Sequence, residues 1–207
     1  DGYLTQVYDQ NGNFMALSYV TEGSGSALRK LLTSVTDGAG RVTTIIRDAS
    51  QRITGVTTPD GRTTILRYLG NNLSSIVYPN GLSSAFTYDD SGRMTSVINR
   101  DGSRLSFTYP TNTSLPLCEQ NRVLKIQEYG SDTTSGNYIR LSYQSDNTTR
   151  FTYSVNGQEV SELSAFDNMG RTVSCTDETT GAATDYSYTA PASRDGSTNK
   201  LASISSK

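Results

Sequence analysis

The chain of 207 residues contains no histidine and no tryptophan, and it has only two cysteines. The lack of histidine excludes Ser-His-Asp and Cys-His catalysis and every metal site that needs an imidazole. Cys118 and Cys175 lie too far apart in the sequence for a zinc-ligand pair. They form one disulfide if their strands are neighbours, or stay as two thiols, and the sequence supports both alternatives. We predict no catalytic residue, no metal and no cofactor.

Strong charge and long apolar runs are lacking too. Lysine and arginine number 18 against 20 aspartate and glutamate residues, which gives a net charge of −2. Such a balance offers no basic surface for nucleic acid or for an anionic membrane. No run of apolar residues is long enough for a membrane-spanning helix. We therefore predict no nucleic-acid partner and no membrane insertion, and the 34% of hydrophobic residues suits a sheet with one solvent-exposed face better than a thick core.

What the sequence does contain is a repeat of 20 to 21 residues between Asp48 and Tyr109. Four columns of residues share this spacing. The columns are Ile53, Leu73 and Met94; Val56, Ile76 and Val97; Gly61, Gly81 and Gly102; and Tyr68, Tyr88 and Tyr109. A fixed period of this size indicates an array of stacked units.

Each repeat has the pattern of a β-hairpin. Pro59-Asp60-Gly61 and Pro79-Asn80-Gly81 are turn sequences in which glycine accepts a positive φ. The alternation that follows, as in Leu66 and Tyr68, is typical of a strand with one buried face. One hairpin is marginal in water, and stacking supplies the missing burial. We therefore predict an all-β fold of tandem β-hairpins stacked into a continuous, twisted and curved antiparallel sheet.

Outside its best part the repeat degenerates. The intervals from Gly136 to Tyr143 and from Gly181 to Tyr188 match that from Gly61 to Tyr68, and Arg47 stands in the tyrosine column. Both ends of the sequence cut through the pattern, so we expect a segment of a longer protein. We predict one array over 1–207, with the best repeats at 32–109, a loop insertion at 110–121, degenerate repeats at 122–188, a loop at 189–198 and an incomplete repeat at 199–207.

Three motifs carry a family resemblance. Tyr8-Asp9-x-x-Gly12, Tyr88-Asp89-x-x-Gly92-Arg93 and Phe166-Asp167-x-x-Gly170-Arg171, with the later Gly-x6-Tyr, resemble the YD repeat of the Rhs family. That family comprises bacterial Rhs polymorphic toxins, the shell subunits of insecticidal toxin complexes and animal teneurins. The resemblance implies a long β-sheet that spirals into a hollow shell, with the cargo as a separate C-terminal segment. The Asp-Pro motif at which such shells cleave themselves is absent from the sequence, so self-cleavage is not carried over.

From the repeat and the resemblance we predict a non-catalytic structural segment of a secreted or cell-surface bacterial protein. It would form part of a β-sheet shell or scaffold around a C-terminal cargo or toxin. Its partners would be other repeats of the same protein, an encapsulated C-terminal polypeptide, and a second copy of the chain through open sheet edges. We assign structural repeat positions to Gly61, Gly81, Gly102, Gly136, Gly181, Tyr68, Tyr88, Tyr109, Tyr143 and Tyr188.

Two alternatives stay open. In a carbohydrate- or cell-surface-binding module, Tyr68, Tyr88 and Tyr109 would contact a glycan, whereas the simpler interpretation is that aromatic residues on one face pack together. In a glycan-active enzyme, two carboxylates would have to face each other across a cleft.

The charged residues suit turns better than a ligand site. We expect Asp60, Asp101 and the aspartates of the Tyr-Asp pairs to accept local backbone hydrogen bonds. Asp89 and Asp90 lack the spacing of a calcium loop. The arginines at the starts of the units are expected to pair with aspartate or to stack on a neighbouring tyrosine; they are Arg52, Arg93, Arg122 and Arg171.

Overall fold

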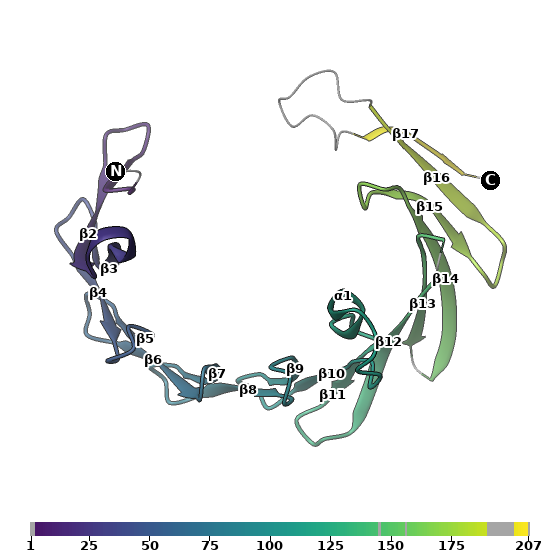
Figure 1. The fold of residues 1–207 in the computed structure, drawn as a ribbon, viewed down its shortest axis with the longest axis horizontal. Helices are drawn as coiled ribbons and strands as arrows, with labels where there is room; N and C mark the ends of the chain where they lie inside the picture. The colour runs from purple at the N-terminus through teal and green to yellow at the C-terminus, as the bar shows by residue number, and fades with distance from the viewer. Residues whose placement is uncertain (1–2, 145, 156, 190–200, 207) are drawn as a thin grey trace. The chain divides into compact units, whose positions relative to one another are not determined.

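The computed structural model describes residues 3–144, 146–155, 157–189 and 201–206, and nearly all of them lie in strands or tight turns (Figure 1). The chain divides into two compact units, Asp1–Phe86 and Thr87–Lys207, here called the N-terminal and the C-terminal unit. Both are antiparallel and built from tandem hairpins, which confirms the predicted all-β fold.

The N-terminal unit is a meander in which each strand pairs with the next along the chain. Short turns, together with the 3-10 turn η1 (Gly25–Ala27), connect the strands. The strands are β1 (Gln6–Tyr8), β2 (Phe14–Glu22), β3 (Arg29–Thr36), β4 (Val42–Arg47), β5 (Ile53–Thr57), β6 (Thr63–Leu69), β7 (Asn72–Val77) and β8 (Ser83–Tyr88), the last of which ends at the start of the next unit.

The C-terminal unit continues with the same antiparallel order. Its strands are β9 (Met94–Ile98), β10 (Arg104–Thr108), β11 (Lys125–Tyr129), β12 (Ser135–Tyr143), β13 (Thr148–Val155), β14 (Gln158–Phe166), β15 (Thr172–Asp177), β16 (Ala183–Tyr188) and β17 (Leu201–Ser206). The predicted insertion at 110–121 holds the four-residue helix α1 (Leu117–Gln120), which the sequence pattern did not indicate. The predicted loop at 189–198 lies outside the described residues, except for Thr189.

The sheet has no apolar core. Among the described residues no hydrophobic side chain is buried, and the buried polar ones are Ser84, Gln127, Thr149, Thr152 and Ser164. The accessible surface is 13803 Å², whereas a compact protein of this mass exposes about 9,400 Å². The expectation of one buried face is therefore wrong. In β6, Leu66 and Tyr68 are half-buried and Ile65 and Leu69 are exposed, because the described residues supply no second layer to cover either face.

A β-bulge recurs at one place in the repeat. The strand register slips between Ile46 and Arg47 and again between Arg67 and Tyr68, just before the residue of the tyrosine column. The partner strand contributes one extra residue there. In the second case it is Ser74, whose hydroxyl donates a hydrogen bond to the carbonyl oxygen of Arg67 at 3.1 Å. Bulges of this kind add twist and re-aim the following side chain, so the bulge positions the column residue at the turn.

The turn glycines match the prediction except at one position. Gly61, Gly81, Gly102 and Gly181 all have a positive φ, as the tight turns require. Gly136 lies inside β12 instead, and the preceding turn places Thr133 at φ 67°. The seven-residue interval from Gly136 to Tyr143 is thus not the interval of the other units. The segment before β12 is built around the Gly130 to Thr134 hydrogen bonds.

The turn after Tyr8 also differs from its predicted role. In a meander, successive turns alternate between the two edges of the sheet, so turn 9–13 lies on the edge of turns 37–41 and 58–62. The Asp48 turn lies on the opposite edge. Tyr8-Asp9 is therefore not equivalent to the other Tyr-Asp or Phe-Asp pairs, and the column residue of this unit is Tyr19, seven residues after Gly12.

Candidate functional site

Three side chains recur together at the edge that carries the Tyr-Asp turns. They are an aspartate that begins the turn, an arginine four residues later, and the tyrosine at the end of the next strand but one. We call this set an arginine–tyrosine cassette. The complete cassettes are Asp48–Arg52–Tyr68, Asp89–Arg93–Tyr109 and Asp167–Arg171–Tyr188.

The aspartate closes the turn. Oδ1 of Asp89 accepts the backbone N–H groups of Ser91 at 3.0 Å and of Arg93 at 2.9 Å, and Oδ2 accepts Nε of Arg93 at 2.7 Å. The backbone N–H of Arg93, together with its guanidinium, lowers the pKa of Asp89 against the opposing effect of burial. The predicted role of these aspartates in turn geometry is confirmed.

The arginine links that turn to the next strand. The guanidinium carbon lies 4.6 Å from the ring centroid of Tyr68 in the case of Arg52, and 4.8 Å from that of Tyr109 in the case of Arg93. Nη1 of Arg93 also donates to the carbonyl oxygens of Pro110 at 3.3 Å and Gln120 at 2.6 Å. The guanidinium thus ties one turn to the ring and to the backbone that follows it.

The tyrosine hydroxyl makes the third connection. Tyr68 donates to the carbonyl oxygen of Ile53 at 2.8 Å, and Tyr109 donates to that of Met94 at 2.8 Å. The acceptor is in each case the residue just after the cassette arginine. The cassette therefore braces neighbouring strands at one edge, which confirms the predicted pairing and stacking of Arg52, Arg93 and Arg171.

Arg122 keeps only half of this arrangement. Its guanidinium lies 5.0 Å from the ring centroid of Tyr143, and the Tyr143 hydroxyl donates to the carbonyl oxygen of Val123 at 2.9 Å. The residue four positions before it is Cys118, in α1. Stacking is therefore confirmed for Arg122, whereas pairing with an aspartate of its own turn is not found.

The structure adds Tyr19 to the tyrosine column and confirms the place of Arg47 in it. Tyr19 donates its hydroxyl to the carbonyl oxygen of Leu4 at 2.7 Å, fifteen residues earlier, as Tyr68 does with Ile53. Nη2 of Arg47 reaches the carbonyl oxygen of Leu32 at 3.3 Å, also fifteen residues earlier. The interval of seven residues from the turn glycine Gly12 would have identified Tyr19 as well.

The tyrosines that were candidates for glycan contact have structural contacts. Tyr68 and Tyr109 are half-buried, each ring has an arginine over it, and each hydroxyl is committed to a backbone carbonyl. Tyr88 is half-buried at the end of β8. In Tyr68 and Tyr109, these contacts use the polar group that a sugar-binding tyrosine would offer.

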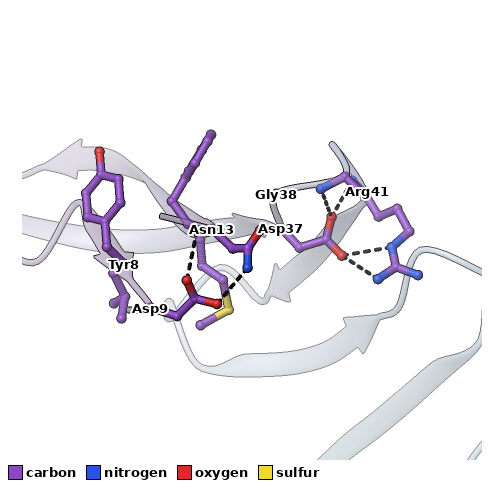
Figure 2. Close-up of a pocket in the computed structure, with 10 residues that line it drawn as sticks. Tyr8, Asp9, Asn13, Asp37, Gly38 and Arg41 are labelled. Carbon is purple, nitrogen blue, oxygen red and sulfur yellow. Dashed lines mark hydrogen bonds and ion pairs between the residues drawn. The ribbon is translucent and has the colours of Figure 1, made fainter. Parts of the chain in front are cut away.

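A surface cavity of about 550 Å³ lies between turns 9–13 and 37–41 of the N-terminal unit (Figure 2). Its two carboxylates serve their own turns: Asp9 accepts the Asn13 amide, and Asp37 pairs with Arg41. The Asn13 side chain lowers the pKa of Asp9, and the Arg41 backbone N–H lowers that of Asp37. A general acid for glycoside cleavage needs a raised carboxyl pKa, so this pair does not supply one.

Within the described ranges, no group of three or more histidine, cysteine, aspartate or glutamate residues could hold a metal ion. Cys118 is exposed on α1 and Cys175 is half-buried in β15, and both are free. In the part of the chain that the structure describes, no helix is long and apolar enough to cross a membrane.

Comparison with known proteins identifies the repeat. The RHS repeat family matches residues 29–68 and 69–104. No curated protein matches the sequence significantly. The crystal structure of TcdB2-TccC3 is similar in fold at a TM-score of 0.58 and 12% identity, covering 97% of this chain and 11% of that one.

A second structure agrees with this. TcdB2-TccC3 without its hypervariable C-terminal region gives a TM-score of 0.57 and 12% identity, again over 97% of this chain and 11% of that chain. This chain thus spans about a tenth of the length of those proteins. The chain carries repeats of the Rhs/YD-repeat family at residues 29–104, in a fold that those two structures share.

Proposed function

We propose that this chain is a structural segment of a secreted or cell-surface bacterial Rhs-like protein. It contributes a stretch of wall to a β-sheet shell or scaffold around a C-terminal polypeptide. The observation that carries the proposal is the arginine–tyrosine cassette, which braces a single-layer sheet and leaves its aspartates committed to turns. Backbone N–H groups of the turn arginines lower the carboxyl pKa of Asp37, Asp89 and Asp167, and the Arg150 side chain lowers that of Glu178, which suits turn and ion-pair roles.

The absence of a core in the described residues supports the same role. A sheet whose apolar side chains are half-buried gains stability from its neighbours along the array, as repeat proteins do. Such a segment suits a wall built from many repeats. One of the similar structures is of TcdB2-TccC3 without its hypervariable C-terminal region, so that protein has a variable C-terminal part. The proposed cargo of the present protein corresponds to such a part.

Limited proteolysis of the full-length protein tests the proposal. The protein is expressed together with the sequence that flanks residues 1–207 in its gene, and the intact product is digested with a protease. We expect the C-terminal segment to be protected, and to become sensitive when cassettes are broken by Arg52→Gln and Arg93→Gln together. Arg62→Gln is the control, because Arg62 is exposed and pairs only within its own turn. If the C-terminal segment is cleaved in the wild type as readily as in the double variant, without any protection, the sheet does not enclose it.

A glycan-array screen of residues 1–207 separates the binding-module alternative. Dose-dependent binding that is lost on Tyr68→Phe, Tyr88→Phe and Tyr109→Phe would favour adhesion over enclosure. We expect no loss that follows these three residues, because the hydroxyls of Tyr68 and Tyr109 are already bonded to the backbone.

A further inference from the structure

The β-bulge between β11 and β12 is built around a buried amide. Glu128 in β11 faces two residues of β12, Gly136 and Asn137, because the register shifts between Gln127 and Tyr129. The Gln127 side chain is 8% exposed. Its Nε2 donates to the carbonyl oxygens of Glu128 at 3.1 Å, Gly136 at 2.9 Å and Asn137 at 3.2 Å. One amide thus binds three carbonyl groups of the bulge and fixes its shape.

The bulge places a carboxylate beside an apolar cavity. Gly136 has no side chain, and Oε2 of Glu128 lies 3.8 Å from the position that a Cβ of Gly136 would occupy. Glu128 and Asn137 line a surface cavity of about 210 Å³. Its aliphatic wall comes from Ile126 and Ile139, which form a cross-strand pair of β11 and β12. The cavity therefore combines a carboxylate with apolar side chains.

An aromatic ring closes the cavity on the side of β13. Tyr153 is paired with Ile139, and its ring stacks on that of Phe151 at 6.4 Å between centroids and 17° between planes. Phe151 is opposite Leu141, whereas Asn137 lies on the other side of Tyr153 along the strands. The ring face that Phe151 leaves uncovered is therefore the one that lines the cavity. The face of an aromatic ring attracts a cation.

The charge of Glu128 is not neutralised by a neighbouring side chain. In the part of the chain that the structure describes, no lysine or arginine lies within ion-pair distance of its carboxylate. Lys125 and Arg140 are on the opposite face of these strands, where both stack on Tyr138. A negative charge beside an aromatic face and an apolar wall suits an organic ammonium ion.

The size of the cavity limits the ligand. A volume of about 210 Å³ is below the range of about 300 to 1,000 Å³ that holds drug-sized molecules. The strands β11, β12 and β13 are each paired on both sides, so a peptide cannot bind there by strand addition. Among the described residues that line the cavity, Glu128 is the only carboxylate, which suits a single positive charge. A short apolar amine fits these limits better than a basic peptide does.

We propose that this cavity binds a small primary amine, in which an ammonium group is carried on a short apolar chain. Glu128 accepts hydrogen bonds from the ammonium group, the ring face of Tyr153 lies against it, and Ile126 and Ile139 contact the apolar chain. The site uses no residue of the arginine–tyrosine cassettes, and binding there does not depend on whether the protein encloses a cargo.

Ligand-observed NMR on the full chain at pH 7 tests the site, with n-butylamine, n-butanol, methylamine and tetralysine as probes. We expect butylamine to bind about fivefold more tightly than butanol, which lacks the charge, and than methylamine, which lacks most of the apolar chain. Glu128→Gln should weaken butylamine binding about fivefold and leave butanol binding unchanged. Glu159→Gln is the matched control, because Glu159 lies on the opposite face beside Arg140 and should affect neither ligand.

A charge reversal keeps the test decisive if the effect of Glu128→Gln is small. Glu128→Lys should lose butylamine binding and gain binding of butyrate, with an unchanged circular dichroism spectrum, because the Glu128 side chain is exposed. Equal butylamine binding in the wild type and in Glu128→Lys would overturn the proposal. Butanol binding as tightly as butylamine would overturn the assignment to an amine, and tetralysine binding more tightly than butylamine would overturn the assignment to a small ligand.

Discussion

A turn of this sheet can close without the side chains of a cassette, as a comparison of turn 89–93 with turn 144–148 shows. The first has aspartate, glycine and arginine at the positions where the second has Gln144, Asn147 and Thr148. Both close with the same hydrogen bond, at 2.9 Å from Asp89 to Arg93 and at 2.9 Å from Gln144 to Thr148. The side chains therefore do not dictate the turn. Instead, they brace it against the strand that follows.

We expect the largest effect on the stability of the chain from a fall in pH. The Arg93 backbone N–H holds the pKa of Asp89 below its ordinary value, and the equivalent N–H of Arg171 does so for Asp167. A lowered folded pKa gives stability that is present above the unfolded value, near 4, and is lost as the pH falls through the folded value. Urea unfolding between pH 7 and pH 2.5 should show this loss.

Asp89→Asn with Asp167→Asn serves as the control for the acid experiment. The double variant should be less stable at pH 7 and should lose less stability on acidification than the wild type. Parallel pH profiles for the two proteins would contradict the assignment of the acid sensitivity to the cassettes.

Removal of one guanidinium should have the next largest effect. Arg93→Ala deletes an ion pair, the stacking on Tyr109 and two hydrogen bonds to carbonyl oxygens. We expect a loss of about 2 kcal/mol in the free energy of unfolding, since the hydrogen bonds and the stacking are partly buried. Arg41→Ala removes an exposed pair only and should cost much less. Equal losses in urea unfolding would show that the ring and carbonyl contacts contribute nothing.

Loss of a single hydroxyl should have a smaller effect. Tyr109→Phe removes the hydrogen bond to the carbonyl oxygen of Met94 and leaves the ring under Arg93. The expected cost is about 1 kcal/mol. Tyr8→Phe is the matched control, because that hydroxyl is exposed and bonds only to the Gln6 side chain. Thermal unfolding of the two variants distinguishes a bracing hydroxyl from an idle one.

A substitution at a turn should stabilise the chain slightly. Thr133 is β-branched and sits at φ 67°, where glycine is favoured. Thr133→Gly should gain up to about 1 kcal/mol, with the larger backbone entropy of glycine in the unfolded chain offsetting part of the relief. Gly81→Ala, at φ 82°, should lose stability by the same reasoning. A destabilised Thr133→Gly variant would show that the turn is not strained.

Much of this fold could be predicted because the same hairpin pattern occurs several times in the sequence. The hairpins followed from alternation around Gly61, Gly81 and Gly102, and the expected pairing or stacking of Arg52 followed from its place at the start of a unit. Single matches were weaker guides. Gly136 kept the right interval by coincidence, since Thr133 takes the turn position. A motif repeated in register reports structure, whereas one isolated spacing does not.

Other features had no signal in the pattern. The bulges before Arg47 and Tyr68 depend on which residue of the partner strand is left unpaired. The alternation of apolar and polar residues does not indicate that residue. The half-buried face was missed because the same alternation occurs in covered and uncovered sheets. The surface cavity of about 270 Å³ beside Thr148 and Phe166 had no signal either. It lies where the arginine and aspartate of a cassette are replaced, and a repeated motif indicates only the side chains that are present.

The large exposed surface has a thermal consequence. The heat capacity of unfolding grows with the apolar area that unfolding exposes. A chain that leaves 13803 Å² accessible when folded exposes less new surface on unfolding than a compact protein of the same mass, so its heat capacity change should be smaller than that of such a protein. A small change flattens the curve of stability against temperature. The stability of the sheet should then differ less between cold and moderate heat than that of a compact protein of the same mass.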